Sequence, residues 1–293
     1  MSTDSLTRIA IHLHLYYQNM WPQIKHNLAS INNATCDLFV TLTEENQELK
    51  KEILAFHPNS QIWIVANRGY DVGPFIDFLH HIDLDKYDLI LKLHTKSQTK
   101  AVALVINGLI LDKKLWKDFL FQGLLATPKL FNNIITQFKL DPKLGMVGAK
   151  RLITTKEKTS EISRPLVNKI MKKLGFSTPK EIKFIAGTMF MCRTQILKPI
   201  KNNYSLTDFE KTKGSSTDGT LAHALERVFG TLTIALGYNI KGFDRNYSLL
   251  FRAYLKKFWH FVYQNKFTHN HYHLIKICKL PIYRKTHIRK RDA

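Results

Sequence analysis

The sequence predicts an α/β protein with an open, mainly parallel sheet that is flanked by helices. In the first hundred residues, apolar runs at 9–15, 36–42, 62–65 and 89–93 alternate with stretches of helical spacing. Strands that alternate with helices form β-α-β units, and such units build parallel sheets. The chain has 293 residues, 44% of them apolar, so it is long enough to bury a sizeable core.

The elements of the first half follow from local signals. Residues 8–17 alternate with period two, which puts aliphatic side chains on one face and His12 and His14 on the other. We expect His12 to be an ordinary interior histidine, because polar groups inside sheets are usually hydrogen-bonded. One helix is predicted to begin at Trp21–Pro22, and another to be capped by Thr43.

The second half is less regular. Helices are predicted at residues 116–126 and 128–138, a strand at 144–149 and a longer strand at 184–193. Gly187 would lie inside that last strand, where a glycine often marks the close approach of a ligand or another backbone. A loop with a short helix is predicted for residues 98–108, and a further helix for residues 218–229.

Net charge limits the classes of partner that this protein can have, and the number of cysteines indicates its cellular compartment. The formal net charge is +21 and the sequence pI is about 9.8, which favours nucleic acid, an anionic membrane or phosphate-bearing substrates as partners. Three widely separated cysteines without metal-ligand spacing indicate free thiols in a reducing compartment. The first residues lack the apolar core of a signal peptide, so we expect a cytoplasmic protein, peripheral on the inner face of the cytoplasmic membrane.

The composition changes at residue 247, so residues 1–246 are predicted to form one domain and 247–293 a basic helical C-terminal tail. One acid, Asp292, faces many cations: Arg252, Lys256, Lys257, Lys266, Lys276, Lys279, Arg284, Lys285, Arg289, Lys290 and Arg291. Interleaved aromatic residues suit an anionic membrane surface and equally suit single-stranded nucleic acid. Because no nucleic-acid-binding fold signature appears elsewhere, we favour the membrane and expect no nucleic acid; a merely solvated tail is the third reading.

Two polar clusters follow predicted strands. Asn67 to Asp71 comes after the strand at 62–65, and His94 to Lys96 ends the strand at 89–93. The carboxyl ends of parallel strands share one edge of a sheet, so both clusters are expected to face one crevice. The alternative is a pair of ordinary solvated loops. Phosphate-binding Gly-rich loops, HExxH, GxSxG and paired cysteines are all missing from the sequence, as is a strand-ending Asp-x-Asp.

Five blocks in fixed order carry a resemblance to a known family. They read NRGYDVGPFI from residue 67, YDLILKLHTKS from 87, LGMVG from 144, FIAGTMFMCR from 184 and DGTLAHALERVFG from 218. Together they resemble the rhamnan synthesis F family of bacterial polysaccharide glycosyltransferases, from about residue 9 to residue 237. The resemblance leaves out the basic tail.

The resemblance implies a GT-A-like fold and transfer of a sugar, with rhamnose the commonest presumption, from a nucleotide-sugar donor to a cell-surface or lipid-linked glycan. It implies a donor nucleotide and sugar near Tyr16, Asn67, Gly69 and Asp71. The donor diphosphate would lie near the strand that, in ordinary GT-A enzymes, ends in the metal-binding Asp-x-Asp motif. Here that position, Leu93 to Lys96, reads Leu-His-Thr-Lys.

This departure predicts a site that requires no metal. A diphosphate leaving group needs positive charge as the glycosidic bond breaks, and fixed cations can supply it. We therefore predict diphosphate binding by Lys96 and His94, supported by Arg68. His94 could instead bind Mn²⁺ or Mg²⁺ together with Asp71, and the sequence leaves that alternative open.

The acceptor side needs a base, because an attacking hydroxyl must lose its proton in an inverting transfer. Asp218 is the predicted base, with Asp208, Glu210 and Glu226 as competitors; its alternative role is a helix cap. Gly187, Thr188 and Glu226 are expected to line the acceptor side. Two other functions stay open: a non-catalytic basic protein that binds nucleic acid, and a degenerate transferase fold that binds sugars without turnover.

Overall fold

The computed structural model describes residues 7–31, 35–96, 104–155, 162–211, 219–244, 247–267, 272–278 and 280–286. Its first half is the predicted alternation of strands and helices, ending in a strand one residue longer than expected. The elements are β1 (Arg8–His14), α1 (Trp21–Leu28), β2 (Thr35–Leu42), α2 (Gln47–Phe56), β3 (Gln61–Ile64), α3 (Val72–His81) and β4 (Leu89–His94). Asn46, and not Thr43, caps α2 by accepting a hydrogen bond from the Leu49 amide at 3.0 Å.

A seven-stranded sheet forms the centre of the molecule, in the order β11-β7-β10-β4-β1-β2-β3. The strands β7 (Leu144–Ala149), β10 (Phe190–Arg193) and β11 (Asn239–Phe243) come from the second half of the chain. All neighbours pair in parallel except β10, which is antiparallel to both β4 and β7. The predicted open, mainly parallel sheet flanked by helices is confirmed.

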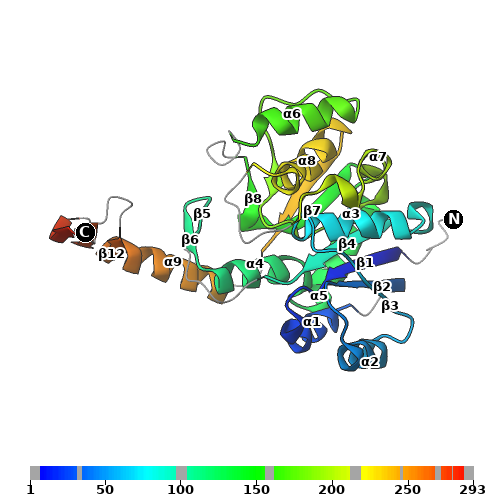
Figure 1. Ribbon diagram of the computed structural model, residues 1–293, viewed down its shortest axis with the longest axis horizontal. Coiled ribbons are helices and arrows are strands. Elements are labelled where there is room, and N and C mark those ends of the chain that lie inside the picture. Colours follow the sequence, from blue (N-terminus) through cyan, green and yellow to red (C-terminus); the bar gives the residue numbers. More distant parts are fainter. Residues whose placement is uncertain are drawn as a thin grey trace, which may run out of the picture.

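Helices cover both faces of this sheet, as Figure 1 shows. On one face α3 packs against β1, β2 and α8 (Leu221–Ala235), with α6 (Arg164–Lys173) and α7 (Lys198–Asn203) beside them. On the other face α4 (Lys113–Leu125) packs against α1, α5 (Pro128–Leu140) and β7. One continuous core therefore fills both layers, and β1 and β4 are buried along nearly their whole length.

Several elements of the second half differ from the predictions. Of the stretch predicted as a loop with a short helix, residues 98–103 lie outside the described residues, and residues 104–111 form a hairpin of β5 (Leu104–Ile106) and β6 (Leu109–Leu111). The apolar run at 184–193 is not one strand: β9 (Phe184–Ile185), which pairs with β8 (Ile153–Thr154), is separated from β10 by a turn. Gly187 lies in that turn. The helix α6 was not predicted, and the helix cap before α8 is Thr220.

The C-terminal segment begins with the predicted helix, but the prediction of a helical tail is wrong beyond residue 262, where strands follow. The helix α9 (Tyr247–Val262) packs against β6 and α4, and the strands β12 (Tyr263–Phe267), β13 (Tyr272–Ile277) and β14 (Leu280–Thr286) follow as a small antiparallel sheet. Because α9 packs on the body, a division of the chain at residue 246 stays a prediction. Among the described helices, none combines the length and the apolar character needed to span a bilayer.

Candidate functional site

A row of polar side chains crosses the carboxyl edge of the sheet. In the strand register His14 of β1 pairs with Thr41 of β2 on one side and with His94 of β4 on the other, and His12 pairs with Lys92. Residues two apart on a strand share a face, so all five side chains belong to the face that α3 covers. The Thr41 hydroxyl lies 3.0 Å from a ring nitrogen of both histidines of β1. The sequence predicted His12 to be interior, and it is fully buried.

Asp71 is the centre of the site. Its Oδ2 atom accepts a hydrogen bond from Lys92 Nζ at 2.6 Å and another from the hydroxyl of Thr188. Lys92 Nζ also donates to the Thr188 carbonyl at 3.0 Å, and its side chain is fully buried. Asp71 and Lys92 therefore join the loop after β3 to the turn before β10, which the sequence had assigned to the donor and acceptor sides.

Both of these segments hold left-handed backbone conformations. The pair Gly69 and Tyr70 has φ of 64° and 55°, and the pair Gly187 and Thr188 has φ of 100° and 52°. A β-branched residue at positive φ is an outlier that the surrounding structure must hold in place, and such residues gather at functional sites. Here the contacts of Thr188 with Asp71 and Lys92 hold it.

The two glycines are required by packing as well as by φ. A Cβ at Gly69 would lie 2.3 Å from Phe209 Cδ1, and a Cβ at Gly187 would lie 3.0 Å from Leu120 and from Trp116 Nε1. The assignment of Gly187 to the acceptor side stays a prediction. The structure adds a packing reason for the glycine, namely the tight approach of α4.

Trp116 and Glu226 complete the surroundings of the Gly187 turn. The ammonium of Lys96 lies 4.2 Å from the centroid of the Trp116 ring, a cation–π contact at the end of β4. Glu226 of α8 accepts a hydrogen bond from the Gly187 amide at 2.6 Å. This hydrogen bond links the Glu226 carboxylate to the Gly187 turn, so Glu226 can help to position that turn.

Burial and neighbouring charges set the protonation states. Burial alone would raise the pKa of Asp71, but its neighbours His94, Lys92 and Lys96 hold it well below its ordinary value. At pH 7, where the His94 imidazole is neutral, the Lys92 and Lys96 ammonium groups keep the carboxylate ionised. Burial lowers the pKa of Lys92, against the attraction of Asp71. The proton stays on Lys92 because its partner is a carboxylate of depressed pKa at 2.6 Å.

His94 is neutral at pH 7. Burial lowers its pKa well below the ordinary value of 6.5, and Lys96 and Lys92 add to this effect against the opposing charge of Asp71. The residue is 1% exposed. Its Nδ1 lies 3.4 Å from Asp71 Oδ2, yet neither ring nitrogen has a hydrogen-bond partner among the residues that the structure describes. Such an orphaned buried imidazole is a candidate hydrogen-bonding group for a ligand.

The other predicted site residues lie around this centre with different roles. Tyr16, 42% exposed, follows β1 and stacks edge-on with Tyr17. Asn67 is half-buried in the loop after β3. Arg68 donates to the Phe209 carbonyl at 2.8 Å, so part of its guanidinium fixes the loop. Asp218 lies outside the described residues.

Sequence reasoning did not assign Lys92 or Trp116 to the site. A lysine in the middle of the apolar strand LILKLH was a usable signal, because a buried lysine needs a counter-charge nearby. Trp116 had no such signal, since its approach to Lys96 depends on how α4 packs. Of the competing bases, Asp208 is engaged in a local cap, accepting from the Ser205 amide at 2.7 Å.

The described residues do not form a fitting site for a divalent cation. Asp71 is already bound to Lys92 and Thr188, and the end of β4 places the Lys96 ammonium where a metal motif would supply a carboxylate. No group of three potential ligands from His, Cys, Asp and Glu lies within reach of one ion in the ranges described above. The Lys96 ammonium, beside an Asp71 carboxylate that Lys92 already pairs with, instead makes this edge suited to an anion.

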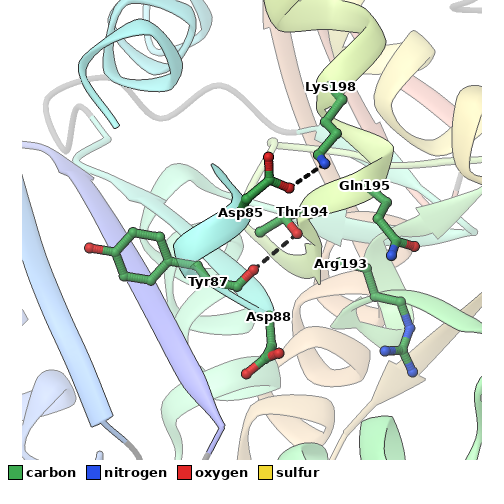
Figure 2. Close-up of a pocket in the computed structure, with 7 residues that line it drawn as sticks. All are labelled: Asp85, Tyr87, Asp88, Arg193, Thr194, Gln195 and Lys198. Atoms are coloured by element: carbon green, nitrogen blue, oxygen red, sulfur yellow. Dashed lines mark hydrogen bonds and ion pairs between the residues drawn. The ribbon is translucent and has the colours of Figure 1, made fainter. Parts of the chain in front are cut away.

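A separate hollow of about 230 Å³ lies at the opposite edge of the sheet (Figure 2). It is lined by residues that precede β4 and follow or end β10, including Asp88, Arg193 and Lys198. Its polar groups have structural partners: Lys198 pairs with Asp85, Thr194 donates to the Tyr87 carbonyl, and Arg193 donates to carbonyls that include Leu144. We therefore assign this hollow no part in the site.

The arrangement is similar to that of two solved enzyme structures. A mannosyltransferase, PcManGT from Pyrobaculum calidifontis, in complex with GDP-Man and Mn²⁺, matches 81% of this chain and 55% of its own, with a TM-score of 0.39 and 10% identity. Glucosyl-3-phosphoglycerate synthase from Mycobacterium tuberculosis, in complex with Mn²⁺, UDP and glucosyl-3-phosphoglycerate, matches 96% of this chain and 90% of its own, with a TM-score of 0.38 and 9% identity. Likeness at this level carries no conclusion about substrate or metal.

Sequence comparison gives the firmer result. Uncharacterized protein WxcX of Xanthomonas campestris pv. campestris (strain B100) is 27% identical over 230 residues, which cover 78% of this chain and 32% of the relative. The chain thus spans about a third of the length of the curated relatives it matches. The family model described as rhamnan synthesis protein F matches residues 1–238, most of the chain and all of the site described above. The chain belongs to the rhamnan synthesis protein F family.

Proposed function

We propose that this chain is a glycosyltransferase that moves a sugar, with rhamnose the first candidate, from a nucleotide-sugar donor to a cell-surface polysaccharide or a lipid-linked glycan. The observation that carries the proposal is the joining of the loop after β3 to the turn before β10 by Asp71, Lys92 and Thr188, beside the Lys96 ammonium. Family membership supports the reaction class. The nucleotide-sugar complexes of the similar structures are compatible with it and are not needed for it.

The reaction makes one bond and breaks one. The oxygen of an acceptor hydroxyl bonds to the anomeric carbon of the sugar, and the bond from that carbon to the diphosphate oxygen breaks with its electron pair. The diphosphate thereby gains negative charge, which a positioned cation stabilises. The hydroxyl proton must pass to a base, and in an inverting transfer the family resemblance favours Asp218.

Lys96 is the residue that we assign to the leaving group. It is only partly buried at the end of β4, whereas Lys92 is fully enclosed and already paired with Asp71. His94 is neutral, so its contribution is a hydrogen bond and not a charge. This revises the sequence-based proposal, in which His94 and Lys96 shared the role of cation. Arg68 supports the donor loop through Phe209.

The proposal is tested by ligand-induced thermal stabilisation with a panel of nucleotide sugars and free nucleotides, with and without EDTA or Mn²⁺. A ligand that binds only the folded protein raises its Tm by mass action. We expect one nucleoside diphosphate and its sugar to raise the Tm regardless of EDTA. A rise that requires Mn²⁺ would refute the fixed-cation site while keeping the transferase.

Two variants make the test specific. Lys96→Met should weaken nucleotide binding about tenfold or more, because it removes a charged hydrogen-bond donor. Lys172→Met, which removes an exposed lysine of α6, should leave binding unchanged. Asp218→Asn should keep donor binding and abolish transfer to an isolated glycan acceptor. Stabilisation by oligonucleotides and by no nucleotide sugar would favour the nucleic-acid-binding alternative.

A further inference from the structure

The helix α9 packs only one side against the body of the protein. Leu249 and Ala253, 5% and 0% exposed, face β6 and α4. Two ion pairs fasten the same side to α4 and its N-cap residue: Arg252 with Asp118 of α4 at 4.0 Å, and Lys256 with the N-cap Asp112. In Figure 1 this helix, drawn in orange, extends from α4 and away from the central sheet beside the hairpin of β5 and β6. Its orientation is thus set by buried residues and charge pairs.

The opposite side of α9 is a continuous apolar stripe. Helical residues spaced three, four and seven apart share a face, and here such spacing unites a set of exposed side chains. They are Tyr247, Phe251, Tyr254, Leu255 and Phe258, with exposed fractions of 84%, 67%, 49%, 44% and 58%. Trp259 and Phe261, 58% and 45% exposed, border the stripe on its two sides. We call these seven residues the aromatic face.

The aromatic face is about as large as the largest apolar patch on a typical monomer, and such a patch is often functional. Aromatic side chains present about 150–250 Å² each, and roughly half of that is exposed in Phe251, Tyr254, Phe258 and Trp259. These four alone give an apolar patch on the order of 400 Å², comparable with the largest functional patches on monomers. A patch of this size, raised on a projecting helix, is typical of an interaction surface.

The basic composition of the C-terminal segment indicates the partner of the aromatic face. Lys257 is exposed beside the stripe, and the chain that continues from α9 holds eight further Lys and Arg residues against one acid: Lys266, Lys276, Lys279, Arg284, Lys285, Arg289, Lys290 and Arg291 against Asp292. An apolar stripe in a segment this basic matches an anionic lipid surface, whose acyl region takes the aromatic rings and whose headgroups take cations. Single-stranded nucleic acid instead needs cations distributed along the stacking residues.

We propose that the aromatic face of α9 docks the protein onto an anionic lipid bilayer, with the helix lying in the plane of the interface. This inference goes beyond sugar transfer and does not depend on it. It also has a geometric consequence. The helix is fixed to α4, and α4 carries Trp116 beside Lys96, so docking would hold the candidate site at a set height above the lipid headgroups.

The test is flotation of the full chain with vesicles of phosphatidylcholine alone and of phosphatidylcholine mixed with phosphatidylglycerol. We expect binding to the mixed vesicles, weakened by salt because part of it is electrostatic. The double variant Phe251→Ser/Phe258→Ser should lose binding by about tenfold or more. The matched control Leu54→Ser/Ile64→Ser changes two exposed apolar residues of α2 and β3, 41% and 43% exposed, and should bind as the wild type does.

A second measurement reports on the face directly. Trp259 is the most exposed of the four tryptophans, so its emission should shift to the blue on vesicle binding, and Trp259→Phe should remove that shift. Equal vesicle binding by the wild type and Phe251→Ser/Phe258→Ser would overturn the proposal. So would binding to oligonucleotides and not to vesicles, or a dimer that the double variant converts to a monomer. Nucleotide-induced stabilisation should be the same in the double variant, which separates this inference from the transferase proposal.

Discussion

Replacing Lys92 by methionine should destabilise the protein strongly, although the two side chains have similar length and stem. Lys92 is fully buried, donates to Asp71 at 2.6 Å and to the Thr188 carbonyl at 3.0 Å. Its loss leaves a carboxylate that is only 18% exposed without its closest counter-charge. Breaking one partner out of a buried pair costs about 3–5 kcal/mol, and we expect the lower end because Lys96 still lies near Asp71.

A double-mutant cycle measures the pair itself. Asp71→Asn alone leaves the Lys92 ammonium buried without a carboxylate, and should also cost about 3 kcal/mol. Asp71→Asn/Lys92→Met removes both charges at once, so its cost should fall short of the sum of the single changes by about 2 kcal/mol or more. The assay is urea unfolding at neutral pH, followed by far-UV circular dichroism, with the unfolding free energy taken from each transition.

Two results would refute this reasoning. A cost below about 1 kcal/mol for Lys92→Met would mean that Asp71 finds adequate solvation without the lysine. Strict additivity of the two changes would mean that the pair is not coupled. Lys172→Met, on the exposed side of α6, is the control for removing a lysine and should change stability by less than about 0.5 kcal/mol.

Three further predictions concern the surroundings of the pair. Gly69→Ala should cost more than Gly175→Ala in urea unfolding, because both glycines have positive φ but only Gly69 has a neighbour, Phe209, within 4 Å of the added Cβ; equal costs would contradict the packing argument. Glu226→Gln keeps an acceptor for the Gly187 amide and should retain most transfer activity, whereas Glu226→Ala should cost about 1–3 kcal/mol of stability; near-complete loss of transfer in the Gln variant would instead identify a base. Burial lowers the pKa of His14 from 6.5 to about 4. Between these two pH values the unfolded state binds more protons than the folded state. The free energy of unfolding should therefore fall by about 3 kcal/mol as the pH drops from 6.5 to 4. The drop should be smaller in His14→Gln, and a free energy independent of pH across that window would refute the shift.

The sequence predicted the fold where local and global signals agree. β1 and β4 combine an apolar run with an abrupt polar end, and their positions at the centre of the sheet follow from β-α-β connectivity. The turn at Gly187 was missed because FIAGTMFMCR is apolar apart from Thr188 and the final Arg193, so the break between two buried strands leaves little trace in hydropathy. Thr43 and Asn46 are both good caps, and the choice between them depends on where the chain leaves β2.

The candidate site was predictable in outline. The loop that holds Asp71 and the end of β4 that holds His94 and Lys96 were expected at one edge of the sheet, and the structure brings them together. The pairing of Asp71 with Lys92 was not expected, because it depends on the side-chain register between a loop and a strand 21 residues further along. The neutrality of His94 was also hidden, since it results from burial beneath elements that are distant in sequence.

Because β10 runs antiparallel to its neighbours β4 and β7, its two ends lead to opposite edges of the sheet. The amino end of β10 follows the Gly187 turn beside Asp71, whereas its carboxyl end leads to Gln195, at the edge that holds the hollow of Figure 2. Gln195 is exposed, and its side chain accepts only a hydrogen bond from Tyr238 among its described contacts. A spectroscopic label or a surface tether could therefore be attached at Gln195 without altering the Asp71 edge of the sheet. Immobilisation through this position would present that edge to ligands in solution.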